Sequence, residues 1–210
     1  MIRLTCLPVL LTFIATTIPY TILDVYYSEF QSIYLIIVVL NVFIDYALLI
    51  VFLREIGVMS ADDNGRIGTF FFVYLMCPAL ILIGFLMFVI PGLILTARMV
   101  PVMAAAVSGD RDVAGTIKWS WSATRNVQGA IALAMVVPFV CVLLAIAAIL
   151  HWEFFYLETP EVWPAYEWGS ALLVNTSLSV ALIWMSALGA IVYGDISRLP
   201  TDEKFGQAPR

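Results

Sequence analysis

One nearly unbroken apolar stretch, residues 69–107, most strongly constrains how this chain can fold. Its only charged residue is Arg98. A single helix over this range would be roughly 58 Å long at about 1.5 Å per residue, whereas the hydrocarbon core of a bilayer is about 30 Å thick. The stretch therefore contains two crossings, or one crossing and a re-entrant piece. We predict spans at 69–90 and 93–107 with the break at Pro91-Gly92, because Pro lacks a backbone donor and Gly accommodates a turn.

The composition of the whole chain supports a lipid environment. It is 63% hydrophobic and 12% charged, whereas soluble domains carry about 25% charged residues. Four further apolar stretches, at 4–23, 32–53, 129–150 and 170–193, are long enough to cross a membrane. The sequence therefore predicts an all-α, polytopic integral membrane bundle of about six spans over residues 1–194, followed by a cytoplasmic tail at 195–210.

The basic residues predict the orientation of this bundle. In the six-span arrangement the loops 24–31, 91–92 and 151–169 contain no Lys or Arg. The basic residues on the opposite side are Arg3, Arg54, Arg66, Arg111, Lys118, Arg125, Arg198, Lys204 and Arg210. The positive-inside rule then places both termini in the cytoplasm, and we interpret the protein as a multi-pass protein of a bacterial inner membrane.

Asp45 and Arg98 form the first candidate site, an intramembrane polar pair. Counted from the inner ends of their predicted spans, both lie roughly 13–15 Å deep at about 1.5 Å per residue. Each charge alone costs at least about 2.5–3.5 kcal/mol in the membrane, so equal depth and opposite sign predict that they neutralise one another, with Asn41 one turn away. Two interpretations stay open: a structural ion pair, or a proton- or anion-responsive site in a polar cavity.

The segment 112–126 is the second candidate site. Val113, Ile117 and Trp121 recur at every fourth position and form an apolar face. Polar side chains occupy another face: Lys118, Ser122 and Arg125. Asp110 or Asp112 is placed to cap the first turn. This pattern predicts an amphipathic elbow helix at the membrane interface whose cations bind lipid phosphates. The alternative is an elbow that only orients the next span.

The sequence carries no recognisable enzyme motif, and we predict neither an enzyme nor a bound metal or cofactor. His151 is the only histidine, so no H-E-x-x-H metal site or Ser-His dyad within the membrane can be assembled, and no G-x-S-x-G is present. The acidic residues near His151 are Glu153, Glu158, Glu161 and Glu167. They indicate an acidic, aromatic belt at the outer interface, with an external cation site as the alternative.

The cysteines and the last span add packing predictions. Cys6, Cys77 and Cys141 lie within spans without metal-type spacing, and we expect them to serve as small apolar packing residues. In the last span we expect interhelical hydrogen bonds from four polar side chains. They are Ser170, Asn175, Thr176 and Ser177.

Part of the chain resembles a known family. The resemblance rests on Pro91-Gly92, Arg98, Pro101 and the pattern K-x-S-W-x-x-T-R. This pattern is formed by Lys118, Ser120, Trp121, Thr124 and Arg125. Over roughly residues 80–150 this resembles the membrane domain that is fused to bacterial glycerophosphoryl diester phosphodiesterases and also occurs alone. A typical member has an acidic residue near the end of the Arg-bearing span, where this chain has Ala104-Ala105-Ala106-Val107. The resemblance implies a multi-span bundle with a lipid or phosphodiester connection and carries over no catalytic residue.

Together these observations predict a non-enzymatic inner-membrane protein that engages membrane lipid, in particular anionic phospholipid, or a membrane-protein partner or second copy of itself. Such a protein would be accessory to envelope or phospholipid processes. The alternative function is a small transporter with its polar site at Asp45 and Arg98. No nucleic-acid partner is expected.

Overall fold

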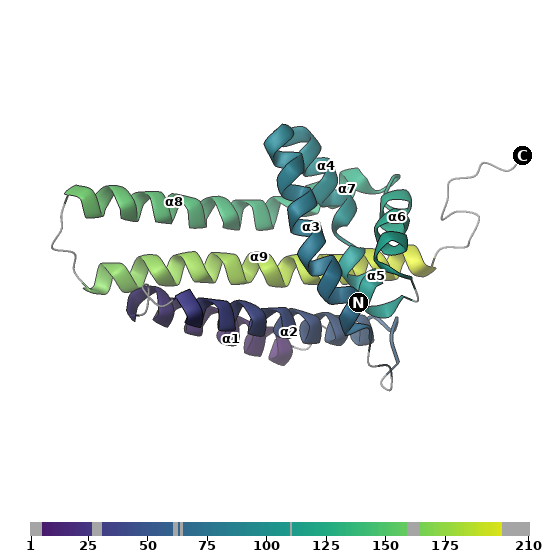
Figure 1. Cartoon of the computed structure of the whole chain (residues 1–210), viewed down its shortest axis with the longest axis horizontal. Coiled ribbons are helices and arrows are strands. Elements are labelled where there is room, and N and C mark those ends of the chain that lie inside the picture. The colour runs from purple at the N-terminus through teal and green to yellow at the C-terminus, as the bar shows by residue number, and fades with distance from the viewer. Residues whose placement is uncertain are drawn as a thin grey trace, which may run out of the picture. The chain divides into compact units, whose positions relative to one another are not determined.

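The computed structural model describes residues 6–26, 31–60, 63, 65–109, 111–158 and 164–198 (Figure 1). These residues form helices α1 to α9 and, within the described ranges, no strand. The predicted tail at 195–210 lies outside the described residues from position 199 onward. The all-α prediction is confirmed.

Six helices of the described residues are long and apolar enough to cross a membrane. These candidate spans are Cys6–Tyr26, Leu35–Glu55, Ile67–Leu86, Ile90–Ser108, Val136–Phe154 and Tyr166–Arg198. The predicted polytopic membrane bundle is thus confirmed at the level of helix number, length and composition.

The chain divides into two compact units. Among the described residues, the first contains 45–60, 63, 65–109, 111–135 and 185–198. The second contains 6–26, 31–44, 136–158 and 164–184. Two helices contribute to both units, α2 (Gln31–Glu55) and α9 (Pro164–Arg198). We refer to these as unit 1 and unit 2.

Unit 2 is built from long helices whose exposed surfaces are mostly apolar. It contains α1 (Cys6–Tyr26), the first part of α2, α8 (Val136–Glu158) and the first part of α9. Only 11% of the apolar window of α8 is buried within the protein. Because an apolar surface of this extent is unfavourable in water, its natural surroundings are acyl chains.

Unit 1 contains a hairpin of α3 (Ile67–Met87) and α4 (Val89–Met99), followed by the shorter helices of the chain. The predicted break at Pro91-Gly92 is wrong by a few residues, because the chain turns at Phe88, whose backbone is extended (φ −170°, ψ 156°). Pro91 lies in the first turn of α4, where its missing N–H costs no intrahelical bond. Gly92 instead allows close packing, since a Cβ there would lie 2.5 Å from the ring of Phe85.

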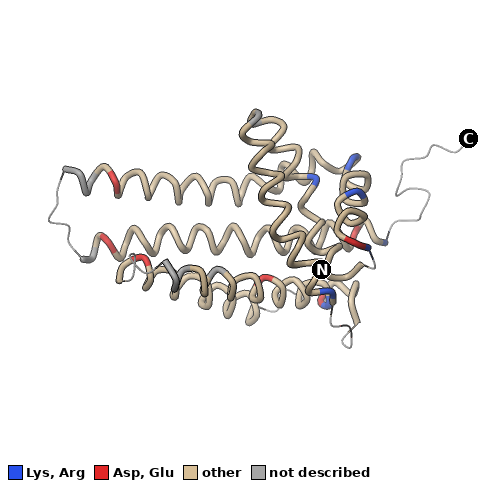
Figure 2. The backbone as a smooth tube through the Cα atoms, viewed as in Figure 1, with Lys and Arg blue, Asp and Glu red and all other residues tan. Residues whose placement is uncertain are grey.

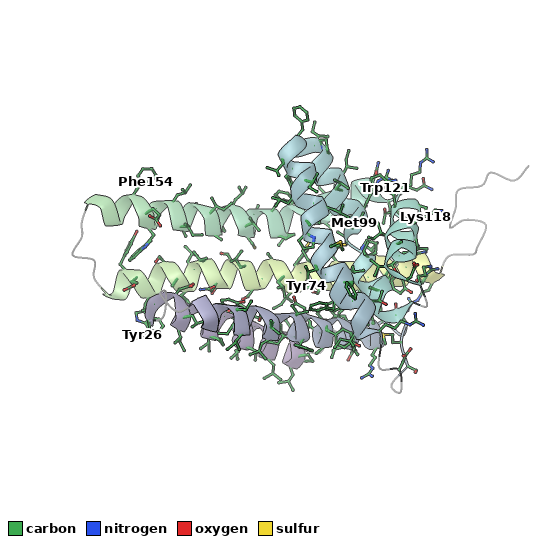
Figure 3. The ribbon with its side chains drawn as sticks, in the orientation of Figure 1. Tyr26, Tyr74, Met99, Lys118, Trp121 and Phe154 are labelled. Carbon is green, nitrogen blue, oxygen red and sulfur yellow. The ribbon has the colours of Figure 1, made fainter. Side chains whose placement is uncertain are left out.

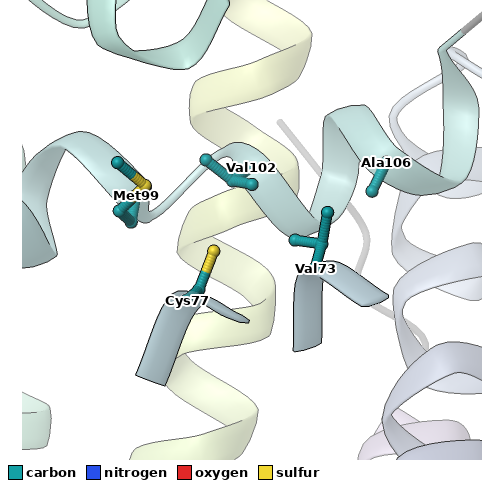
Figure 4. Close-up of a cluster of buried hydrophobic side chains, with 5 residues drawn as sticks. All are labelled: Val73, Cys77, Met99, Val102 and Ala106. Carbon is teal, nitrogen blue, oxygen red and sulfur yellow. The ribbon is translucent and has the colours of Figure 1, made fainter. Parts of the chain in front are cut away.

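The second half of this stretch is buried in unit 1. Pro101 separates α4 from α5 (Val102–Ser108), in which nearly every side chain is inaccessible. The cluster around it combines residues of α3, α4 and α5, shown in Figure 4: Val73, Cys77, Met99, Val102 and Ala106. Cys77 therefore acts as the small packing residue that the sequence predicts.

The predicted span at 129–150 is divided into two helices. Residues of α7 (Gln128–Ala134) belong to unit 1, and α8 begins at Val136. Pro138 explains the division, because it has no N–H to bond the carbonyl of Ala134 in a continuous helix.

Candidate functional site

The predicted elbow is present as α6 (Val113–Ala123) in unit 1. Its first turn is capped by Asp112, whose Oδ1 accepts a hydrogen bond from the Gly115 N–H at 2.9 Å. The capping prediction is confirmed for Asp112, while Asp110 lies outside the described residues. An N-cap of this kind satisfies one of the donors that a helix start leaves unpaired, so α6 begins at a fixed residue.

A stripe of three small hydroxyl side chains forms the buried face of α6. Thr116, Ser120 and Thr124 are each 0% exposed and follow one another at every fourth position. The Ser120 hydroxyl donates to the carbonyl of Arg98 on α4, and the Thr124 hydroxyl donates to the carbonyl of Ser120 at 2.7 Å. The bond of Ser120 joins α6 to α4, whereas the bond of Thr124 stays within its own segment. Sequence reasoning did not predict this buried stripe, although the i, i+4, i+8 spacing of hydroxyl residues was a usable signal.

The predicted polar face of α6 points away from the protein. Lys118, Ser122 and Arg125 are exposed, and the Ser122 hydroxyl donates to the Trp119 carbonyl at 2.9 Å. Figure 2 shows Lys and Arg along α6 and the chain next to it, and Figure 3 shows the side chains of Lys118 and Trp121 on this helix. The helix therefore presents accessible cations on one face, while its opposite face is buried in the protein.

Tryptophan and arginine pairs extend this basic face. The guanidinium of Arg111 lies 5.2 Å from the centre of the Trp119 ring, and that of Arg98 lies 4.2 Å from the centre of the Trp121 ring. Both distances are within the range of cation–π attraction. Indole rings favour the headgroup level of a bilayer, so this combination of rings and cations suits an interfacial position.

Arg98 is held by α6 and α7. Its Nε and Nη2 donate to Oε1 of Gln128 at 3.2 and 3.1 Å, and its Nη1 donates to the Trp121 carbonyl at 3.1 Å. An arginine has five N–H donors and remains charged. Among the described side chains it is stabilised by these neutral oxygens and the indole ring, and no carboxylate bonds it.

Asp45 lies in a different environment of the same unit. It is 5% exposed, and its Oδ2 accepts a hydrogen bond from the Tyr74 hydroxyl at 2.9 Å. Its Oδ1 has no hydrogen-bond partner among the described residues. The rings of Tyr46, Phe70 and Tyr74 form a consecutive series beside it, with centroids 5.2 and 5.6 Å apart.

The predicted contact between Asp45 and Arg98 is therefore not formed among the described side chains. Each residue has its own partners, Tyr74 for the first and Gln128 with Trp121 for the second. The proposed third member, Asn41, donates to the Tyr20 hydroxyl at 2.9 Å in unit 2. Equal depth along the membrane normal does not specify the direction in which a side chain leaves its helix, and α4 turns Arg98 toward α6 and α7.

Unit 2 contains a separate polar seam between α1 and α9. The hydroxyls of Thr16 and Thr17 both donate to Oγ of Ser179, at 2.8 and 3.0 Å, and Asn175 Nδ2 donates to Asp24 Oδ2 at 2.6 Å. The expected interhelical bond of Asn175 is confirmed, whereas the Ser170 hydroxyl bonds the carbonyl of Glu167 in its own helix. Such bonds join membrane helices to each other.

The surroundings of His151 are aromatic in the part of unit 2 that the structure describes. Its ring lies 5.9 Å from Tyr166, and Trp152 stacks on the same tyrosine at 5.5 Å. Among the described side chains no three His, Cys, Asp or Glu residues are grouped to hold a metal ion. Glu161 and the side chain of Glu158 lie outside the described residues.

Comparison of the chain with protein-family models, curated proteins and solved structures finds no match. The resemblance to the phosphodiesterase-associated membrane domain thus stays a prediction. The site is characterised by its own geometry: a capped helix, a buried hydroxyl stripe and an exposed basic face flanked by indole rings.

Proposed function

We propose that this multi-span membrane protein is non-enzymatic and engages anionic phospholipid through the exposed face of α6. The observation that carries the proposal is the two-sidedness of that helix. Thr116 and Ser120, together with the C-cap residue Thr124, are fully buried on one side. Lys118, together with Arg125 just after the helix, is exposed on the other. A basic side chain near an anionic membrane surface contributes about 1 kcal/mol, and a helix fixed in orientation loses little entropy when it binds.

The chemistry of the face matches a lipid phosphodiester. Lys118 and Arg125 supply charge, the Ser122 hydroxyl is within the same exposed surface, and Trp121 supplies an indole for the headgroup region. The proposal includes a bacterial inner membrane, both termini in the cytoplasm, and a role accessory to envelope or phospholipid processes. The one-sided distribution of Lys and Arg and the resemblance described above support these finer statements.

Lipid retention tests the proposal directly. The double variant Lys118→Glu, Arg125→Glu removes two favourable contributions of about 1 kcal/mol each, so retention of anionic phospholipid should weaken at least about thirtyfold. Native mass spectrometry of detergent-solubilised protein measures the retained lipid, with a zwitterionic phospholipid for comparison.

The matched control keeps the charge. Lys118→Arg with Arg125→Lys should retain anionic lipid to within a few-fold of the original protein, since both positions stay cationic. Unchanged retention by the double Glu variant, in a protein that melts at the original temperature, would leave α6 as a structural elbow only.

A transporter is the second candidate, supported by the buried carboxylate of Asp45 with one oxygen unpartnered among the described residues. In this interpretation the site consists of Asp45 and Tyr74, because Arg98 is bound by α6 and α7. Ion-driven flux in proteoliposomes that disappears in Asp45→Asn and persists in the double Glu variant of α6 would favour it over the lipid proposal.

A further inference from the structure

We infer that the α3–α4 hairpin enters the membrane and returns on the same side, with its tip among acyl chains near the bilayer centre. The tip is the turn at residues 86–90. Its partner is the hydrocarbon of the leaflet on the side of α6. The inference uses the interfacial position of α6 but does not require that α6 bind a particular lipid.

The composition of the hairpin tip differs from that of the chain before the connection between α8 and α9. Residues 75–95 contain no charged, hydroxyl or amide side chain, and the turn itself reads Leu-Met-Phe-Val-Ile. The connection between α8 and α9, by contrast, is preceded by His151, Trp152 and Glu153. Chain segments that emerge into water carry polar residues, and the interface favours Trp and Tyr. The α3–α4 turn has neither.

The tip exposes large apolar side chains. Leu86, Phe88 and Ile90 are 77%, 75% and 70% exposed. Three such side chains at one turn would form an apolar patch on a water-facing loop. In acyl chains the same side chains are in their preferred surroundings.

The backbone of the turn is suited to hydrocarbon. The Phe88 N–H donates to the Gly84 carbonyl at 3.1 Å, and the Phe88 carbonyl accepts from the Gly92 N–H at 3.2 Å. Both polar groups of the turn residue are thus satisfied within the hairpin. Because an unsatisfied backbone polar group costs several kcal/mol in hydrocarbon, these two bonds lower the cost of placing Phe88 there.

The depth of the hairpin follows from Arg98. Its guanidinium bonds the carbonyl of Trp121 in α6. Lys118 of α6 and Arg125, just after the helix, are exposed, which places this level at the membrane surface. Ten residues separate Arg98 from Phe88, which at about 1.5 Å per residue gives a length of about 15 Å along the helix and a depth no greater than that. The hydrocarbon core is about 30 Å thick, so the tip does not pass beyond about half of it.

The chain from Arg98 to Ser108 does not continue α4 through the bilayer. The window of the candidate span at Ile90–Ser108 is 61% buried within the protein, and the side chains of Val102, Ala104 and Ala105 are fully enclosed. Gly189 of α9 closely approaches the α4–α5 junction, because a Cβ there would lie 2.7 Å from the Val100 carbonyl. Within unit 1, Figure 1 shows α3 and α4 running across the last turns of α9 instead of alongside them.

Single-cysteine labelling in vesicles of both orientations tests the inference. The background carries Cys6→Ala, Cys77→Ala and Cys141→Ala, which removes all three cysteines. The test positions are Phe88→Cys and, independently, Leu86→Cys. A membrane-impermeant maleimide should label neither above the cysteine-free background from either side. The controls Asp63→Cys and Glu153→Cys should each be labelled, from opposite sides.

Depth-dependent quenching completes the test. A membrane-permeant bimane attached at position 88 should be quenched most by lipids brominated near the methyl end of the acyl chain. Maleimide labelling from the side of Glu153→Cys would show a full crossing and overturn the inference. Labelling from the side of Asp63→Cys, or strongest quenching near the headgroup, would place the tip outside the bilayer centre and also overturn it. Anionic-lipid retention is measured separately, so a failure of the α6 proposal is distinguishable.

Discussion

The apolar helices of the two units differ in how much of their surface is buried within the protein. In unit 2 the window of α8 is 11% buried, so its apolar side chains are available to lipid, whereas in unit 1 the window of α4 and α5 is 61% buried against other parts of the protein. Both segments are apolar enough to cross a membrane. Hydropathy therefore identifies a segment that avoids water but does not distinguish between lipid and protein as its surroundings.

The polar contacts of the two units differ for the same reason. In unit 2 the side chains of Thr16 and Thr17 bond a side chain of another long helix, Ser179. In unit 1 side chains bond backbone carbonyls near helix ends, as Ser120 does with Arg98 and Arg98 with Trp121. Broken helices leave carbonyl groups without intrahelical partners, and unit 1 uses these groups to hold its short helices together.

Overpacking provides the largest expected difference between the units. Ala106→Leu adds three carbons to a fully buried position in the cluster of α3, α4 and α5, and should lower the free energy of unfolding by about 1–3 kcal/mol. Ala147→Leu makes the same change at an exposed position of α8 and should change it by less than about 0.5 kcal/mol. Thermal unfolding in detergent measures both variants. Equal losses would contradict the difference in packing between the units.

A double-mutant cycle tests the separation of the two charged residues within unit 1. Asp45→Ala and Tyr74→Phe should be coupled by about 0.5–3 kcal/mol, because they remove the two ends of one hydrogen bond. Asp45→Ala and Arg98→Ala should be additive within about 0.5 kcal/mol, since they share no partner. The unfolding free energies of the single and double variants provide the measurement. Strong coupling between positions 45 and 98 would instead support the ion pair that equal depth predicts.

Single hydroxyl groups should give the smallest differences. Ser120→Ala removes the hydrogen bond to the buried carbonyl of Arg98 and should cost about 0.5–1.5 kcal/mol. Ser179→Ala removes a helix-to-helix contact in unit 2 and should cost about 0.6 kcal/mol, because the separated helices find other partners in the membrane. Ser122→Ala on the exposed face of α6 is the control, with a change below about 0.5 kcal/mol. The same detergent unfolding assay applies, and a larger loss at position 179 than at 120 would reverse the comparison.

Much of the candidate site was predictable because the relevant signal is local. The spacing of Lys118, Ser122 and Arg125 indicated a common exposed face, and Asp112 stood at the start of the helix that it caps. The buried stripe was less evident, because Thr116, Ser120 and Thr124 are polar and a burial pattern is usually read from apolar residues. These hydroxyls are buried because each one donates to a backbone carbonyl.

The sequence by itself determined that this chain is helical and belongs in a membrane. About twenty consecutive apolar residues are enough to decide that a segment avoids water, and this property does not depend on distant contacts. Only the tertiary structure decided that the hairpin turns at Phe88, that α5 is enclosed by protein, and which partners hold Asp45 and Arg98. Those outcomes depend on the direction in which each side chain leaves its helix and on carbonyls freed where helices break, and position along the chain does not specify which distant groups these will meet.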